Sequence, residues 1–139
     1  MLYKMKTNSI KEVMTKNVVC VSPEQQLIDV KHIYEKDNFH HHIPVEVNGK
    51  LVGMVSLIDF MYNISGAGLS DTNAVYKEKK VKDIMTPNPF FLTINATIED
   101  VLKALSQGNY HAVPVLKNEM IVGIVSTADL IKYFMQKTL

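Results

Sequence analysis

The chain has 139 residues and a formal net charge of +1, and 47% of its residues are hydrophobic. This length suits one compact domain and this composition argues against disorder, while the near-zero charge provides no electrostatic footprint for nucleic acid. No apolar run approaches the roughly 18 residues needed to cross a bilayer. A single cysteine excludes an internal disulfide framework and fits a reducing cytoplasm.

The first half of the chain predicts a helical turn, a strand, a helix, a hairpin and a second helix, in that order. Ser9-x-x-Glu12 is a capping-box pattern that opens the turn. Leu27, Val30 and Ile33 then follow at helical spacing. The Asn48-Gly49 pair is the strongest short-range signal for a type I′ hairpin. The predicted elements are a strand at 18–21, a helix at 27–37, strands at 43–47 and 51–55, and a helix that begins at Ser56.

The second half predicts the same order of elements. A strand at 90–92 is followed by a helix that Thr97 caps and Gly108 ends, a hairpin around Asn118-Glu119, and a helix at 127–136. Residues 65–71 have the composition of a linker. The expected domains are a first motif at 1–64 with its N-terminal segment, a linker at 65–79 and a second motif at 80–139.

Each half therefore reads β-α-β-β-α, which predicts an α/β (α+β) fold in which a sheet packs against helices. The sequence repeats itself in support of this division. His41-His42-Ile43-Pro44-Val45 returns 70 positions later as His111-Ala112-Val113-Pro114-Val115, and Lys11-Glu12-Val13-Met14-Thr15 returns 71 positions later as Lys82-Asp83-Ile84-Met85-Thr86. Two such copies are expected to pack sheet to sheet about a pseudo-twofold axis and to share a core.

The ordered set of motifs resembles the cystathionine-β-synthase (CBS) domain, and two of them in tandem resemble a Bateman module. The resemblance rests on Val-Met-Thr, His-His-Ile-Pro-Val and Leu-Val-Gly-Met-Val-Ser-x-x-Asp-Phe, and spans about residues 9–137. It implies a regulatory module that binds AMP, ADP, ATP or S-adenosylmethionine in clefts between the motifs. It also implies a disc-like homodimer of four motifs, no obligatory cofactor, and an effector protein that the sequence does not identify.

The resemblance places the ligand on a duplicated Ser-x-x-Asp pattern. It implies that Asp59 and Asp129 accept hydrogen bonds from ribose hydroxyls, and that hydroxyls of Ser56, Ser126 and the adjoining Thr127 support the sugar or a phosphate. A carboxylate has two acceptor oxygens that match a vicinal diol, and a helix N-terminus favours phosphate. The same pattern is also a capping box that needs no ligand. The two interpretations are compatible, because a carboxylate has spare lone pairs.

Histidines are the expected neighbours of the phosphate. His41 and His111 match a histidine of the family, whereas His42 and Ala112 stand where the family often has arginine. All 15 basic residues of the chain are lysines, so the two-pronged hydrogen bonds of arginine are not available and tight triphosphate binding is in doubt. Histidine is a weak substitute, since its charge is lost above about pH 6.5. A metal site at 40–42 is disfavoured, because adjacent strand residues point to opposite faces.

The remaining predictions concern a strand, a thiol and the class of protein. The resemblance implies that backbone groups around Val21 and Phe91 border the base, and Cys20 is interpreted as a small buried hydrophobic residue. We find no catalytic motif, phosphate loop or metal-ligand spacing, so an enzyme is not expected. The alternative is a ligand-free homodimeric scaffold. The predicted ligand-binding set is Ser56, Asp59, Ser126, Thr127, Asp129, His41, His42, His111, Val21 and Phe91.

Overall fold

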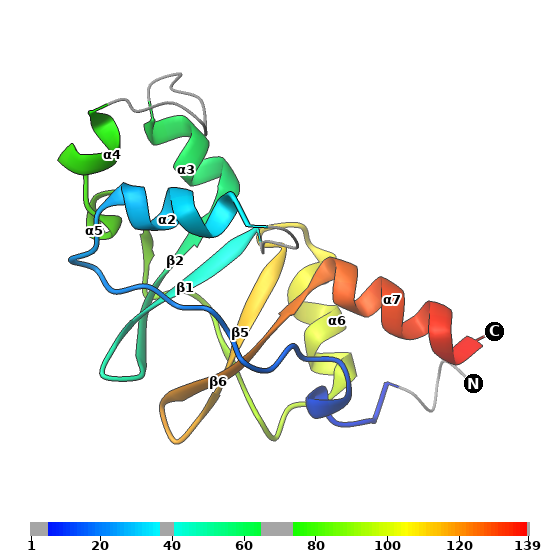
Figure 1. Ribbon diagram of the computed structural model, residues 1–139. Helices are drawn as coiled ribbons and strands as arrows, with labels where there is room; N and C mark the ends of the chain where they lie inside the picture. The colour runs from blue at the N-terminus through cyan, green and yellow to red at the C-terminus, as the bar shows by residue number, and fades with distance from the viewer. Residues whose placement is uncertain (1–5, 37–40, 65–73, 139) are drawn as a thin grey trace. The chain divides into compact units, whose positions relative to one another are not determined.

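The computed structural model describes residues 6–36, 41–64 and 74–138. The chain forms two compact units (Figure 1). We call residues 19–89 the first unit, and residues 1–18 together with 90–139 the second unit. Residues within a unit contact one another in space more than they contact the other unit, and the divisions fall after Val18 and after Pro89. The predicted boundaries 1–64, 65–79 and 80–139 follow the sequence repeat and stay a prediction.

The first unit contains a hairpin with helices before and after it. Its elements are α2 (Leu27–Tyr34), β1 (His42–Val47), β2 (Lys50–Ser56), α3 (Leu57–Asn63), α4 (Val75–Glu78), α5 (Val81–Ile84) and β3 (Thr86–Pro87). Strands β1 and β2 pair antiparallel, and β3 pairs with β2 on its other edge. The predicted mixed α/β class is confirmed for this unit.

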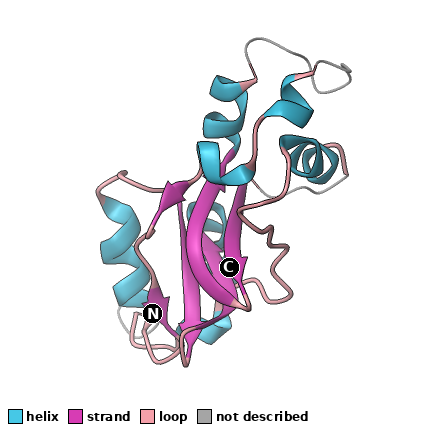
Figure 2. Cartoon of the chain, turned by 90° about the vertical axis from the view of Figure 1, so that its left-hand side faces the viewer, coloured by secondary structure: helices cyan, strands magenta, loops and turns pink. Residues whose placement is uncertain are grey.

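The second unit repeats this order. Its elements are η1 (Ile10–Glu12), β4 (Leu92–Thr93), α6 (Ile98–Ser106), β5 (Ala112–Lys117), β6 (Met120–Ser126) and α7 (Thr127–Thr138). Strand β4 pairs parallel with β5, and β5 pairs antiparallel with β6. The order β-α-β-β-α is therefore confirmed here, and β5 and β6 are longer than β4. Figure 2 distinguishes the strands and helices of the chain by colour.

Local sequence signals were reliable at the turns and helix starts. Asn48 and Gly49 have φ values of 53° and 82°, as a type I′ turn requires, and the second hairpin turns in the same way at Asn118 and Glu119. Thr97 caps α6 as predicted, and its side chain forms a capping box with Asp100. Gly108 has a φ of 75° just beyond α6, which is the left-handed conformation of a C-terminal glycine.

Two predicted strands are shorter than expected. In the segment 18–21 only Val21 pairs, as an isolated parallel bridge to Val45. In the segment 90–92 only Leu92 lies in a strand, because β4 begins there. An apolar run predicted a strand in each segment, but only the last residue of each run, Val21 or Leu92, pairs with the neighbouring hairpin. Ser9 caps η1 by accepting the N–H of Lys11 at 3.2 Å rather than that of Glu12.

The helix predicted at 27–37 ends at Tyr34, and Asp37 lies outside the described residues, as do residues 65–71 of the predicted linker. The described part of the expected linker contains helix α4, where Tyr76 is only 1% exposed. Val75 and Tyr76 are apolar residues next to a charged stretch, and both are buried in the core of the first unit. This burial stabilises the short helix.

Two glycines allow a second chain segment to approach the hairpin closely. A Cβ on Gly53 would lie 2.5 Å from the Met85 Sδ and 3.1 Å from the Thr86 carbonyl oxygen. In the second unit, a Cβ on Gly123 would lie 2.7 Å from the Met14 Sδ and 3.1 Å from the Thr15 carbonyl oxygen. Each Met-Thr segment therefore packs on the glycine of the other sequence repeat, since Met14-Thr15 belongs to the first repeat and Gly123 to the second.

Each unit has its own apolar core. In the first unit the core includes Phe60, whose ring meets Tyr34 edge-on at 5.2 Å and stacks on Tyr76 at 6.1 Å. In the second unit Ile10 is fully buried against the helices and hairpin of the second repeat. The leading segment of the chain is therefore part of the second unit's core.

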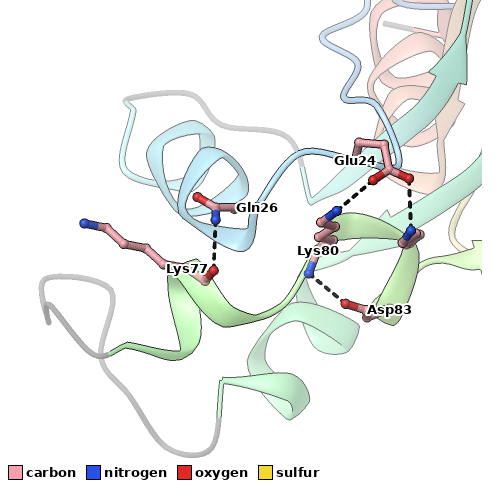
Figure 3. Close-up of polar contacts among 6 residues, drawn as sticks. Glu24, Gln26, Lys77, Lys80 and Asp83 are labelled. Atoms are coloured by element: carbon pink, nitrogen blue, oxygen red, sulfur yellow. Dashed lines mark hydrogen bonds and ion pairs between the residues drawn. The ribbon is translucent and has the colours of Figure 1, made fainter.

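Surface ion pairs hold α5 to the turn before α2 (Figure 3). We call this group, Glu24 with Lys80 and Lys82, the clasp. The Glu24 carboxylate accepts hydrogen bonds from the Nζ of Lys80 at 2.8 Å and of Lys82 at 3.0 Å. The Asp83 carboxylate accepts the backbone N–H of Lys80 at 2.8 Å, which caps α5.

Backbone hydrogen bonds reinforce the clasp. Leu27 N–H donates to the Lys79 carbonyl at 3.0 Å, and Val81 N–H donates to the Gln25 carbonyl at 2.8 Å. The Gln26 side chain adds a bond from its Nε2 to the Lys77 carbonyl at 2.9 Å. The segment that leads into Met85 is therefore attached at several points before it reaches Gly53.

We predict that Gly53→Ala and Gly123→Ala each lower the free energy of unfolding by about 1–3 kcal/mol, the usual cost of an extra carbon in a packed site. Thermal and urea unfolding measure this. The matched control is Gly53→Ala combined with Met85→Ala, which removes the closest sulfur. If the loss of stability in the double variant equals the sum of the losses in Gly53→Ala alone and Met85→Ala alone, then contact with Met85 is not the cause.

We predict a pH-dependent effect of Glu24→Gln. Hydrogen bonds from Lys80 and Lys82 lower the pKa of Glu24 below its ordinary value. Because the folded pKa is the lower one, the contribution to stability is present above the unfolded pKa of about 4.3 and is lost as pH falls through the folded value. The variant should melt at a slightly lower temperature than wild type at pH 7, and the difference should shrink as the pH falls below the unfolded pKa of about 4.3. Glu78→Gln is the control, and an equal loss in it would contradict the clasp.

Candidate functional site

The duplicated Ser-x-x-Asp pattern lies at the turn from the hairpin into the following helix. In the first unit the Ser56 Oγ accepts the backbone N–H of Asp59 at 3.0 Å, at the start of α3. In the second unit the Ser126 Oγ accepts the N–H of Asp129 at 3.1 Å, at the start of α7. The helix-capping interpretation of both serines is therefore confirmed.

The two carboxylates differ in what they bind. The Asp129 Oδ2 accepts the backbone N–H of Ser126 at 2.8 Å, which completes the capping box. The Asp59 carboxylate makes no hydrogen bond to any residue within the described ranges, although its backbone carbonyl accepts the Asn63 side chain at 2.7 Å. Within the described ranges, one oxygen of Asp129 is engaged in a hydrogen bond and neither oxygen of Asp59 is.

A histidine carbonyl binds the start of each helix. The His41 carbonyl accepts the N–H of Leu57 at 2.7 Å, and the His111 carbonyl accepts the N–H of Thr127 at 3.0 Å and its hydroxyl at 3.4 Å. Both histidine side chains are exposed. The structure therefore brings His41 to the Ser56–Asp59 turn, and His111 and Thr127 to the Ser126–Asp129 turn.

The strand register places the next residue of each hairpin opposite the serine. His42 on β1 pairs with Ser56, and Ala112 on β5 pairs with Ser126. His42 is half-buried, whereas Ala112 is buried. The first unit therefore has a histidine opposite its serine, and the second unit has an alanine at that position.

Sequence reasoning missed Tyr34 as a neighbour of this site. Its ring is 2% exposed, and its hydroxyl donates to the His41 carbonyl at 3.5 Å. Burial raises the pKa of Tyr34 well above its ordinary value, and the negative charge of Asp59 raises it further. A tyrosine at the end of a core-facing helix was the available signal, but helical spacing does not show what its hydroxyl touches.

Val21 and Phe91 occupy different kinds of position. Val21 is 3% exposed, its N–H donates to the Pro44 carbonyl at 3.0 Å, and its carbonyl accepts the Glu46 N–H at 2.8 Å. The N–H of Val21 is therefore already used by β1. Phe91 lies one residue before β4 and is exposed. In the repeat, Val21 corresponds to Leu92, and Phe91 corresponds to Cys20.

An aromatic pair that the sequence analysis did not single out lies beside His111. Phe90 and Tyr110 stack with ring centroids 5.3 Å apart and an interplanar angle of 6°. They are 44% and 36% exposed, respectively. The local signals were the Phe90-Phe91 dipeptide and an aromatic residue before the histidine, but the two rings are 20 positions apart in the sequence, which hides their contact.

Cys20 and the described histidines were also considered as reactive or metal-ligating groups. Burial, together with the charge of Glu46 and a hydrogen bond to it, raises the pKa of Cys20 to about 11, so the thiol is protonated and a poor nucleophile at neutral pH. Cys20 is half-buried rather than fully buried. Residues 6–36, 41–64 and 74–138 contain no cluster of three metal-ligating side chains, and His40 lies outside these ranges.

Comparison with known proteins identifies the family. The family model of the CBS domain matches the chain twice, at residues 10–66 and 81–136. The chain belongs to the CBS domain family. The resemblance inferred from the repeated motifs is thereby confirmed, and both Ser-x-x-Asp turns lie within the matched CBS domains.

Relatives and solved structures agree with this membership. An uncharacterized protein of Methanocaldococcus jannaschii is 33% identical over 132 residues, which cover 93% of this chain and 45% of that protein. A second relative from the same organism is 24% identical over 93% of this chain and 32% of its own length. The chain thus spans less than half the length of these two curated relatives.

Two crystal structures show the same fold. The Arabidopsis thaliana protein CBSX2 in complex with AMP is 24% identical, with a TM-score of 0.78 over 93% of this chain and 97% of that one. The CBS domain pair of protein MJ0100, in complex with 5′-methylthioadenosine and S-adenosyl-L-methionine, is 23% identical, with a TM-score of 0.78 over 94% and 98% of the two chains.

Every helix that the structure describes is too short or too polar to cross a bilayer.

Proposed function

We propose that this CBS pair is a regulatory module that binds an adenosine-containing ligand at the Ser56–Asp59 turn, the Ser126–Asp129 turn, or both. The observation that carries the proposal is the duplicated carboxylate at a helix start beside an exposed histidine. Solved CBS pairs of the same fold hold AMP, 5′-methylthioadenosine and S-adenosyl-L-methionine. On this proposal the chain is a sensor and not an enzyme.

The ribose is assigned to the aspartates. A carboxylate accepts two hydrogen bonds from a vicinal diol, and Asp59 has both oxygens available in the described structure. Asp129 has one oxygen engaged by the Ser126 N–H, so its bonds to a ribose compete with the cap. We therefore propose that Asp59 contributes more to ligand binding than Asp129.

The phosphate of a nucleotide, or the carboxylate of S-adenosylmethionine, is assigned to the exposed histidines and hydroxyls. His41 and His111 lie beside the two turns, and Thr127 adds a hydroxyl to the second. The chain has no arginine, and histidine and lysine do not form the planar two-pronged bond to phosphate that arginine forms. This favours AMP or S-adenosylmethionine over ATP.

A second proposal concerns self-association, the alternative that needs no ligand. The helix that follows the hairpin in each repeat, α3 and α7, has an exposed apolar side chain at the same position of the repeat. These side chains are Met61 on α3 and Ile131 on α7. In the second unit an apolar groove of about 470 Å³ lies between α6 and α7. Because the same apolar position is exposed in both repeats, we propose that a second copy of this chain covers these helices to form the expected homodimer.

We predict that AMP or S-adenosylmethionine raises the melting temperature and that Asp59→Ala removes most of this shift. A ligand at 100 times its dissociation constant stabilises by about 2.7 kcal/mol, which is several degrees at about 2–4 °C per kcal/mol. Asp129→Ala should lose less. Asp100→Ala is the matched control, because it removes a capping carboxylate of α6 that lies outside both turns. A shift that survives Asp59→Ala combined with Asp129→Ala would contradict the proposal.

We predict that the wild-type chain sediments as a dimer and that Met61→Glu combined with Ile131→Glu makes it a monomer, because a buried unpaired charge is costly. Analytical ultracentrifugation measures this. Met120→Glu is the control, since Met120 is also exposed but lies at the start of β6. A wild-type monomer, or a dimer unaffected by both substitutions, would rule out this surface.

A further inference from the structure

Helix α3, which carries Asp59, is attached to the core of the first unit through one buried aromatic side chain. Of its seven residues, all of which the structure describes, only Phe60 is buried, with 0% of it exposed. Phe60 directly follows Asp59 in the sequence. The position of the Asp59 carboxylate therefore depends on how the Phe60 ring packs, because no other side chain within this helix is buried.

Two buried tyrosines from neighbouring helices pack on the Phe60 ring (Figure 1). Tyr76 of α4 stacks on it with ring centroids 6.1 Å apart and an interplanar angle of 24°, and Tyr34 of α2 meets it edge-on at 5.2 Å. The Tyr34 hydroxyl also donates to the His41 carbonyl, which binds the start of α3. Removal of the Tyr76 ring would leave Phe60 with one aromatic neighbour in this cluster instead of two.

Helix α4 keeps its structure only through such contacts. It has four residues, Val75–Glu78, and no side-chain hydrogen bond caps its start, and a helix this short is unstable alone in water. The Lys31 Nζ lies 5.5 Å from the centroid of the Tyr76 ring, which is a cation–π contact. The Lys79 Nζ donates to the Asn63 carbonyl at the end of α3, at 3.2 Å. Helix α4 is therefore an element with two states, docked on α2 and α3 or undocked.

The second unit has leucines at the corresponding positions of its helices. In the repeat, Lys31, Tyr34 and Phe60 correspond to Leu102, Leu105 and Leu130. Tyr76 corresponds to Met5, which lies outside the described residues. Leucine has neither a ring nor a charge, so it forms no aromatic stack and no cation–π contact. The aromatic support of an aspartate-bearing helix is thus a feature of the first unit.

We propose that Tyr76 is a positioning residue of the first-unit site, and that docking of α4 and binding of a ligand at Asp59 stabilise each other. This inference rests on the proposed function. The Tyr76 ring supports Phe60, and Phe60 fixes the helix that presents Asp59. Because coupling of two binding equilibria is reciprocal, a ligand that prefers the docked form stabilises docking by the same factor. Helix α4 lies between the two matched CBS domains, so the ligand would act on the segment that joins them.

The first experiment measures AMP affinity by isothermal titration calorimetry, with every variant made in an Asp129→Ala background so that only the first-unit site remains. Tyr76→Leu removes the ring but keeps apolar bulk, whereas Tyr76→Phe keeps the ring. Tyr133→Leu is the matched control, because Tyr133 is also buried and has a lysine, Lys137, 5.8 Å from its ring centroid, but belongs to the second unit. Thermal unfolding verifies that each variant folds.

Tyr76→Leu is expected to weaken AMP binding by about 5- to 150-fold, the usual range of coupling between two sites. Tyr76→Phe and Tyr133→Leu should stay within about twofold of the Asp129→Ala parent, as substitutions outside a coupled contact do. A stabilising role alone would lower the melting temperature of Tyr76→Leu and leave the AMP affinity of the folded protein unchanged.

The second experiment needs no substitution at Tyr76 and therefore decides the question even if Tyr76→Leu does not fold. Hydrogen exchange of the Asp129→Ala protein is followed with and without saturating AMP. The Lys79 N–H donates to the Val75 carbonyl at 3.3 Å and the Leu27 N–H donates to the Lys79 carbonyl at 3.0 Å, so these two amides exchange when α4 undocks. AMP should slow them by about the same 5- to 150-fold factor. The Val101 amide of α6 is the control and should slow less.

The outcomes separate this inference from the proposed function. If AMP binds to the first-unit site but its affinity is the same in Tyr76→Leu, or if AMP leaves exchange of the Lys79 and Leu27 amides unchanged, the role of Tyr76 is wrong while the proposed function stands. The same holds if Asp129→Ala alone removes all AMP binding, because the first unit then holds no ligand. If the wild-type chain binds no adenosine compound, the proposed function fails and this inference fails with it.

Discussion

The structure depends on two close approaches of one backbone segment to another. The Met85-Thr86 segment passes Gly53, and the Met14-Thr15 segment passes Gly123. Thr15 exchanges hydrogen bonds with Ile124, at 2.8 and 3.1 Å, one residue beyond Gly123, and Met54 pairs with Thr86 one residue beyond Gly53. A side chain on either glycine would separate these segments. The same strands continue to Ser56 and Ser126, so the glycines that admit the incoming segment also help to fix the turns that carry the candidate site.

The two repeats share a scaffold and differ in the chemistry that they display. Ser56 and Ser126 cap their helices in the same way, and His41 and His111 hold the helix starts through their carbonyls. Around this scaffold, the described part of the first unit has His42, a buried tyrosine, and an Asp59 carboxylate that does not accept the N–H of Ser56. The second unit has a complete capping box, an alanine in place of the second histidine, and a stacked aromatic pair. Duplication of the backbone therefore does not imply two identical sites.

Charge limits what such sites can bind. With no arginine, the chain has only point charges, hydroxyls and backbone N–H groups for an anion. Among the described residues, Glu24 forms ion pairs with Lys80 and Lys82 in the clasp, away from both turns. On the proposed function, recognition at the two turns would therefore depend on hydrogen bonds to a diol and on apolar contact more than on strong electrostatic attraction.

Much of the fold could be predicted from local patterns because those features depend on a few adjacent residues. Asn48-Gly49 determines a type I′ turn through backbone conformation, Thr97 and Asp100 cap α6 through a four-residue pattern, and the repeat indicates a CBS pair. The residues of the two turns were predicted for the same reason, since Ser-x-x-Asp is both a helix start and a family motif. Their role in binding a ligand stays a prediction.

Tertiary structure decided the features that join residues far apart in the chain. No local pattern shows that Met14 packs on Gly123 or that Met85 packs on Gly53, because either methionine suits either glycine. In the segment 18–21, pairing depends on which residues lie next to β1 in the folded chain, and only Val21 pairs, with Val45. The contact of Phe90 with Tyr110 and the engagement of Asp129, but not Asp59, in a capping box depend on side-chain positions that only packing determines. Sequence by itself determined the family, the order of elements and the turns, whereas the partners of each segment required the folded chain.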